Sequence, residues 1–326
     1  MNRKIKYGLV LALTFVLVAV STAQEVKSFL SVQDILAGWQ KNYGSLKSMK
    51  VSYSEEIISA EPSQKDPNIT NRLVKWTYVE RTEEGKKFRA KSSVARVRPP
   101  VAKDSFADIN SVEEVTFDGI HQNRYLPAQN TGQVFAGLTQ KNVGTGNLLK
   151  KYLLSEPYLT SASVKVDEEP EFSKIISKAL SDPNLTVSVR PVLEEIAGQM
   201  CHVLDIEFIK KDNTKGKMAV IWVAHEKGML PMKIQEFGGG TMSRERAVEQ
   251  IDSVKTKDGV LWFPKKAYEV LNLPASLGVI KQEFNVLEFV PDIQVDPNTF
   301  QLNFPNGTQV ADVELGLEYK VGVKQH

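Results

Sequence analysis

The residues that could perform acid–base or metal chemistry are few and lie far apart in this chain. The four histidines, His121, His202, His225 and His326, show neither HExxH nor any other spacing that brings ligands together. Cys201 precedes His202 directly, but neighbours in a strand point to opposite faces, so the two could not form a thiolate–imidazolium pair by adjacency. The pattern predicts no metal site, no cofactor and no catalytic residue.

Serines and carboxylates give no stronger signal for catalysis. The chain has no GxSxG turn to expose a nucleophilic serine. In acidic pairs such as Glu113-Glu114 and Glu194-Glu195, the two side chains point to opposite faces of a strand and so could not act together. A single cysteine rules out an internal disulfide and any site built from several thiolates. The sequence therefore predicts a protein that is not an enzyme. The enzymatic alternative is a hydrolase with His121, His202 or His225 in a polar cleft.

The N-terminus predicts export. A basic stretch at Asn2–Lys6 precedes an apolar run at Tyr7–Val20, and small residues end the segment at Ala23. We expect a signal peptide over residues 1–23, cleaved after Ala23, and a periplasmic or otherwise extracytoplasmic mature protein. An uncleaved membrane anchor is the alternative, but the apolar run is shorter than the roughly 20 residues that a spanning helix needs.

The composition is that of an ordinary folded protein. Of 326 residues, 42% are hydrophobic and 25% are charged, which predicts a sizeable core in one domain over residues 24–326. Loss of Arg3, Lys4 and Lys6 with the signal peptide lowers the formal charge from +2 to −1. The remaining charges are interspersed, so the electrostatic footprint of a nucleic-acid-binding protein is absent.

Hydrophobic periodicity predicts one helix followed mainly by strands. The helix spans Val32–Ser48, where Ser31 can cap it and Asp34 can complete a capping box. From Lys50 onward the period changes to two, with Asp118-Gly119 and Asp258-Gly259 at tight turns. Two shorter helices are expected at Asn147–Leu154 and Glu171–Leu180. Successive hairpins without alternating long helices favour an α+β fold with an antiparallel sheet.

Four segments, in chain order, resemble the outer-membrane lipoprotein-sorting family, the LolA-like and LolB-like periplasmic carriers. Asp34–Tyr53 is similar to the family's opening helix and first strand, and Val115–Pro127 to its strand, Asp-Gly turn and Tyr-x-Pro segment. Trp222–Ile234 looks like a strand pair around a surface turn, and Phe300–Val310 like the closing segment with Pro and Gly-x-x-Val. The resemblance spans most of the mature chain.

The chain also departs from the family pattern. It is longer, with extra material around Pro62–Asn71, Val94–Ile109 and Pro157–Pro183. Tyr78–Arg81 resembles the family's Trp-x-x-Arg-Pro stretch, but Thr82 stands where the proline would be. The resemblance therefore carries over only the arginine, as a lid contact, and leaves the identity of the cargo open.

The resemblance implies an open half-barrel, that is, a strongly curved antiparallel sheet with helices across its concave face. It implies a carrier that moves lipoprotein acyl chains or lipid across the periplasm between membrane-bound donor and acceptor proteins. Burial of acyl chain stabilises a complex by about 0.8 kcal/mol per CH₂, so a releasable carrier must bind its cargo incompletely. A lid that competes with the cargo for burial would meet this requirement.

Large apolar side chains in the first helix and at alternating strand positions are the candidates for the ligand-binding face, together with the carried-over arginine. They are Leu36, Trp39, Trp76, Tyr78, Arg81, Leu204, Ile206, Phe208, Val220, Trp222 and Trp262. The alternative is that these side chains only pack against the helices. A second functional hypothesis is an exported cell-envelope sensor or protein-binding domain on the same fold, and the oligomeric state stays open.

Overall fold

The computed structural model describes residues 30–43, 48–60, 68–81, 85–97, 109–136, 172–210, 214–272 and 278–323. The predicted signal peptide and the predicted helix at Asn147–Leu154 lie outside these ranges. Within them, no helix combines the length and hydropathy needed to cross a membrane.

Strands dominate the described part of the chain. They are β1 (Ser48–Ala60), β2 (Asn68–Arg81), β3 (Gly85–Val97), β4 (Ile109–Phe117), β5 (His121–Leu126), β6 (Thr131–Ala136), β7 (Leu185–Val189), β8 (Glu194–Ile196), β9 (Gln199–Ile209), β10 (Lys215–Ala224), β11 (Leu230–Gly238), β12 (Thr241–Thr256), β13 (Gly259–Asn272), β14 (Val279–Pro291), β15 (Gln309–Asp312) and β16 (Leu317–Lys320). The helices are α1 (Val32–Tyr43) and α3 (Phe172–Ser181), with short 3₁₀ turns η1 (Pro127–Gln129), η3 (His225–Lys227) and η4 (Pro297–Phe300).

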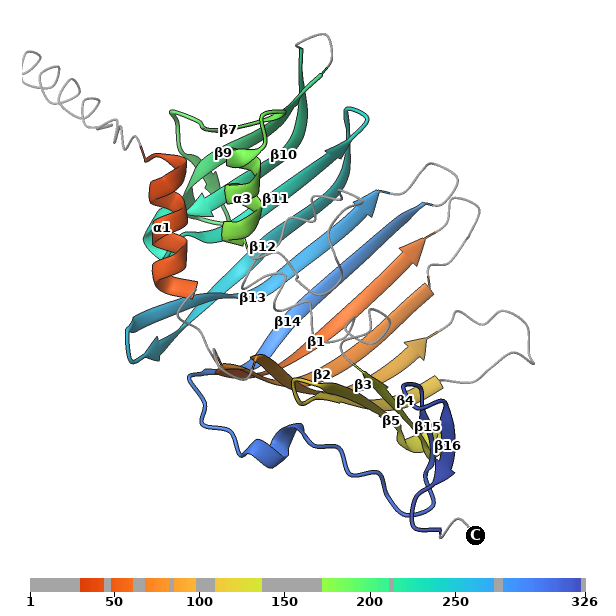
Figure 1. The fold of residues 1–326 in the computed structure, drawn as a ribbon. Helices are drawn as coiled ribbons and strands as arrows, with labels where there is room; N and C mark the ends of the chain where they lie inside the picture. Colours follow the sequence, from red (N-terminus) through yellow and green to blue (C-terminus); the bar gives the residue numbers. More distant parts are fainter. Residues whose placement is uncertain are drawn as a thin grey trace, which may run out of the picture.

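All sixteen described strands belong to one sheet, which is open rather than closed (Figure 1). The order is β16-β15-β6-β5-β4-β3-β2-β1-β14-β13-β12-β11-β10-β9-β7, with β8 paired to β9 beside β7. Neighbouring strands are antiparallel except β15 and β6, which are parallel. The chain thus enters at β1 in the middle of the sheet, builds one half outward to β6, and builds the other half back from β7 to β14.

The predicted α+β class is wrong, because the described structure is mostly β. Only α1 and α3 are α-helices in it, and both lie over one end of the sheet near β7 and β9 rather than across its face (Figure 1). The physical reason lies in the hydrophobic period. Outside these two segments, the apolar residues of the described chain follow the two-residue alternation of strands. The residues that would form helices in an α+β fold lie in long hairpins instead.

The start of α1 is as the sequence predicts. The Ser31 hydroxyl accepts from the Asp34 amide at 3.2 Å, and the Asp34 carboxylate accepts from the Ser31 amide at 2.8 Å, which completes the capping box. The Ser31 hydroxyl also donates to the Asp34 carboxylate at 2.7 Å, and this hydrogen bond, followed by the one from the Ser31 amide, holds the pKa of Asp34 below its usual range. The end was predicted too late: Ser48 and Met49 pair with Val79 and Tyr78 in the sheet, so they are strand residues.

The core lies between the two helices and the sheet. Ile35 and Trp39 of α1 and Ile176 of α3 are at most 1% exposed and belong to the same buried cluster as residues from β1, β9, β10, β11 and β14. The strand residues of this cluster that are fully buried and large are Met49, Tyr53, Leu204, Ile206 and Ile221. The amphipathic face of α1 is therefore docked on the sheet, as its spacing predicts.

Replacement of Trp39 by Ala should lower the free energy of unfolding by about 3 to 5 kcal/mol, because it removes a buried indole and leaves a cavity under α1. Urea titration monitored by circular dichroism measures the change. Gln40→Ala, on the exposed side of the same helix, is the control and should change stability by no more than about 0.5 kcal/mol. Equal effects of the two substitutions would show that α1 is not docked.

Candidate functional site

One row of directly opposed residues crosses five strands and joins the apolar part of the sheet to a charged part. The row runs Leu204, Ile221, Ile234, Arg246 and Glu269, from β9 to β13. Opposed residues of antiparallel strands lie on the same face of a sheet. We call the face that carries this row the core face. Residues of both faces are buried here, because Val203, Val220 and Trp222 of the other face belong to the same cluster as Leu204, Ile221 and the apolar residues of α1 and α3.

The charged part of the core face is a cluster of two arginines and two glutamates, Arg244, Arg246, Glu236 and Glu269. Arg246 is 2% exposed and lies with its guanidinium nitrogens 3.0 Å from Glu236 Oε1 and 3.6 Å from Glu269 Oε2. The Nε of Arg244 lies 3.1 Å from Glu269 Oε1. Removing four charges from water is expensive, and only their mutual attraction and hydrogen bonds offset the cost. The cluster therefore tolerates the loss of no single member.

The opposite face of the same strands, which we call the polar face, carries a second network. Trp222 lies opposite Val203 and Lys233, out of phase with the core-face row. Its indole Nε1 donates to Glu194 Oε2 at 2.7 Å, and Arg190 pairs with both Glu194 and Asp205. The hydrogen bond from Trp222 and then those from Arg190 outweigh burial and hold the pKa of Glu194 below its usual range.

The polar-face network continues onto β12 and β13 around Glu245. Its carboxylate accepts from Gln235 at 2.7 Å and from the Tyr268 hydroxyl at 2.8 Å, and Lys233 Nζ lies 3.0 Å away. Burial alone would raise the pKa of Glu245, but these hydrogen bonds outweigh it and the net direction is down. Burial and the bond to Glu245 raise the pKa of Tyr268 to about 12. Glu245 therefore stays deprotonated and Tyr268 stays protonated at neutral pH.

The structure divides the predicted ligand-binding residues between the two faces. Leu204 and Ile206 are buried on the core face, and Phe208, further along β9 with the same alternation, is 38% exposed. Val220 and Trp222 lie on the polar face instead, opposite Asp205 and Val203, although both are buried in the same cluster as Leu204 and Ile206. The sequence had assigned both sets to one concave face.

The remaining candidates lie on α1, β2 and β13. Trp39 is buried and Leu36 is half-buried against the core, whereas Trp262 is half-buried with Lys227 Nζ 4.0 Å from its ring centre. The backbones of Trp76, Tyr78 and Arg81 pair with Val51, Met49 and Gly85. Val51 and Met49 are core residues, so the two aromatic positions are in phase with the core, and their side chains lie outside the described structure. Ligand binding by all these residues stays a prediction.

The charged cluster was not among the residues predicted from the sequence. Its signal exists in the Arg-Glu-Arg run at positions 244–246, where two like charges recur with the period of one strand face next to buried Ala247 and Val248. The sequence does not say which strands pair. It therefore could not show that the glutamates at 236 and 269 stand beside these arginines.

Cys201 and two of the four histidines, His202 and His225, form a small group near the start of β9. The Cys201 thiol is buried, and its Sγ donates to the Gln199 carbonyl at 3.3 Å. Burial raises the pKa of this thiol to about 12, which removes it from nucleophilic chemistry at neutral pH. The buried ring of His202 lies 5.4 Å from that of His225. The described residues contain no group of three His, Cys, Asp or Glu side chains that could hold a metal.

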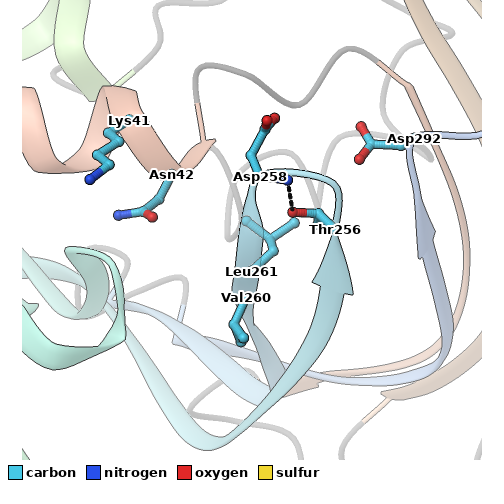
Figure 2. A pocket seen from close by; sticks show the side chains of 7 residues that line it. All are labelled: Lys41, Asn42, Thr256, Asp258, Val260, Leu261 and Asp292. Atoms are coloured by element: carbon cyan, nitrogen blue, oxygen red, sulfur yellow. Dashed lines mark hydrogen bonds between the residues drawn. The ribbon is translucent and has the colours of Figure 1, made fainter.

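A small pocket opens where the end of α1 meets the β12–β13 turn (Figure 2). The Asp258 amide donates to the Thr256 hydroxyl at 3.3 Å beside it. The cavity volume is about 20 Å³, little more than one water molecule requires. It is therefore too small for an acyl chain. Its lining residues are Lys41, Asn42, Thr256, Asp258, Val260, Leu261 and Asp292.

Comparison with solved structures gives only remote similarities. A DUF1329 family protein from Desulfovibrio piger matches with 13% identity and a TM-score of 0.45, over 82% of this chain and 95% of its own. The MucA/MucB complex of Pseudomonas aeruginosa contains a chain with 8% identity and a TM-score of 0.26, over 80% of this chain and 100% of its own. No family model and no curated protein matches the sequence. TM-scores this low do not establish a shared fold.

Replacement of Arg246 by Ala should destabilise the protein by about 3 to 5 kcal/mol, because it leaves Glu236 and Glu269 buried without a full complement of positive charge. Thermal or urea unfolding measures the loss. Lys50→Ala is the matched control: it breaks a half-exposed ion pair with Glu288 and should cost no more than about 1 kcal/mol. A loss for Arg246→Ala as small as that of the control would contradict a buried cluster.

His202 should make stability depend on pH in mildly acidic solution. Burial, and then the neighbouring His225, lower its pKa in the folded state from 6.5. The unfolded state then binds more protons below pH 6.5, so the free energy of unfolding falls as the pH drops through that value. His202→Gln should flatten this dependence when urea midpoints at pH 7 and pH 5 are compared. His225→Gln, which removes only the neighbouring charge, should flatten it less.

Proposed function

We propose that this chain is an exported binding protein that takes a hydrophobic ligand with a polar head, a lipid or the acyl chains of an acylated protein, on the core face beneath α1. One observation carries the proposal. The row from Leu204 to Glu269 changes from apolar to charged between β11 and β12, and its apolar members belong to the same buried cluster as Ile35 and Trp39 of α1. An amphiphilic ligand is divided in the same way, into an apolar tail and a polar head.

In this proposal α1 is a lid whose apolar face stands in for the acyl chain when no ligand is bound. Ile35 and Trp39 are buried in the cluster that also contains apolar residues of β9, β10 and β11. Ligand binding displaces them, so the gain of about 0.8 kcal/mol per buried CH₂ is offset by the loss of helix packing. The difference between these two free energies determines the affinity for the ligand, and it keeps that affinity low enough for the release that a carrier needs.

The charged cluster supplies the other end of the proposed site. A guanidinium presents a planar set of donors that suits a phosphate or carboxylate head group. The Arg244 side chain is 20% exposed and is the member open to exchange partners, whereas Arg246 at 3% keeps the two glutamates neutralised. A polar head at β12–β13 would orient the ligand with its acyl part toward β9–β11.

Such a protein acts by binding and release. It breaks no covalent bond and requires neither a catalytic residue nor a cofactor. The predicted location outside the cytoplasm fits a soluble intermediary that receives its ligand from a membrane-bound donor protein and delivers it to a membrane-bound acceptor.

One observation favours the second hypothesis, an exported sensor or protein-binding domain. The space under α1 is filled, since Ile35 and Trp39 are at most 1% exposed and the pocket at the end of the helix has a volume of only about 20 Å³. If α1 never leaves this position, binding must take place on an outer surface.

A disulfide that locks α1 to the sheet separates the two functions. A Cβ atom at Gly38 would lie 2.7 Å from Cγ of Met229, so Gly38→Cys combined with Met229→Cys is the pair chosen to join α1 to the residue before β11 by a disulfide. In the oxidised form this variant should lose uptake of a fluorescent fatty-acyl probe, because the helix cannot move. Reduction should restore uptake, and native mass spectrometry of the reduced protein should detect bound lipid.

The same variant before oxidation is its own control for the two substitutions. Cys201 is buried and does not compete for the new thiols. Equal uptake by the locked and reduced forms would contradict the lid. Absence of any probe binding or co-purified lipid in the natural protein would shift the function to the protein-binding hypothesis.

A further inference from the structure

The strand β16 ends one side of the sheet in the described structure and leaves backbone groups without a neighbouring strand (Figure 1). The Val321 amide donates to the Thr308 carbonyl at 2.9 Å, and the Val321 carbonyl accepts from the Gly307 amide at 2.8 Å. Backbone groups alternate sides along an antiparallel strand. Glu318 and Lys320 therefore point their amides and carbonyls away from β15.

The sequence around β16 is symmetric about Tyr319. Residues 315–323 read Leu-Gly-Leu-Glu-Tyr-Lys-Val-Gly-Val, so the same residue classes appear in either direction, with the acidic residue on one side matched by the basic residue on the other. A strand that pairs antiparallel with a copy of itself places position 319 minus n opposite 319 plus n. In this arrangement the symmetry of the sequence places each acidic residue opposite a basic residue and each apolar residue opposite an apolar one.

We propose that β16 pairs antiparallel with β16 of a second copy of this chain, about a twofold axis at Tyr319. Glu318 of each copy then lies opposite Lys320 of the other, and both residues have their backbone groups directed at the partner. Leu317 lies opposite Val321, and Tyr319 opposite itself. Two ion pairs form on one face of the joined sheet and an apolar stripe on the other.

The outward backbone groups allow two neighbouring registers, and both are unfavourable. In one of them, Glu318 lies opposite Glu318 of the second copy, and two carboxylates meet. In the other, Lys320 lies opposite Lys320 of the second copy, and two ammonium groups meet. Like charges directly opposite each other destabilise a strand pair. The register centred on Tyr319 is the one that pairs opposite charges at both sites.

Exposed apolar side chains lie within β16 and in the turns on either side of it. Leu315 is 66% exposed, Leu317 56% and Val323 56%. Leu315 and Val323 lie beyond turns at the two ends of the strand, where Gly316 and Gly322 have positive φ, so the apolar stripe of the pairing is limited to Leu317, Tyr319 and Val321. The Lys320 carbonyl already accepts from the Val323 amide at 3.3 Å, and its second lone pair remains for the partner strand.

The interface is short, with a four-residue strand from each copy. Interfaces below the standard size give weak and transient complexes. The dimer should therefore be a concentration-dependent equilibrium. It rests on β16 alone and is independent of the ligand proposed above.

Analytical ultracentrifugation of the mature protein over a dilution series tests the pairing. The natural protein should sediment increasingly as a dimer as its concentration rises. Glu318→Lys and Lys320→Glu should each weaken self-association about tenfold or more, because each places like charges opposite each other twice. An equimolar mixture of the two variants should associate again, as should the double charge swap in one chain.

The controls separate pairing from folding and from net charge. Lys257→Glu, in the exposed β12–β13 turn, makes the same charge change elsewhere and should leave self-association unchanged. Tyr319→Cys should form an intermolecular disulfide under mild oxidation, since the residue faces its own copy, whereas Leu317→Cys should not. A natural protein that stays monomeric at every concentration, or single variants that associate as it does, would overturn the proposal.

Discussion

The pairing register from β9 to β13 is the constraint on which the rest of the described structure depends. Because side chains alternate between faces, one register places Leu204, Ile221 and Ile234 in the core and lines up Arg246 and Glu269 with them. A slip of one residue would move Arg246 to the polar face and bring Glu245 into the buried cluster. The core, the charged cluster and the polar-face network are therefore three results of one alignment.

The two charged networks stabilise this alignment from opposite sides, at different cost. On the polar face, Glu245 keeps partial contact with water, and three neighbours donate to it or pair with it. On the core face, Arg246 and Glu269 are buried and have lost their contact with water. Their mutual attraction only offsets the cost of this burial, so the pair rarely adds net stability. What it does is penalise every alternative register in which a buried charge would lose its partner. We regard specificity of pairing as the structural role of the cluster, alongside its proposed role toward a ligand.

The sequence predicted local structure well and the relations between strands poorly. The capping box of α1 and the turn at Asp118-Gly119 are confirmed, and the turn predicted at Asp258-Gly259 lies one residue earlier, at Lys257-Asp258. Each depends on residues close together in the chain. The α+β class was wrong, and Trp222 was assigned to the face of Leu204. Alternation fixes which residues within one strand share a face, but the phase between strands is set by pairing. The irregularities between Lys217 and Ala219 and between Trp222 and Val223 shift that phase further.

The positions of the two proposed sites make them compatible. In the sheet order, β7 and β9 with the two helices lie at one end and β16 lies at the other, with β1 near the middle. A second copy that joins at β16 extends the sheet away from α1, so it covers neither the helix nor the core face beneath it. Self-association would also place two copies of the core face in one continuous sheet. A ligand with several acyl chains could then meet two lids on one assembly, and ligand uptake by each copy would not require the dimer to separate.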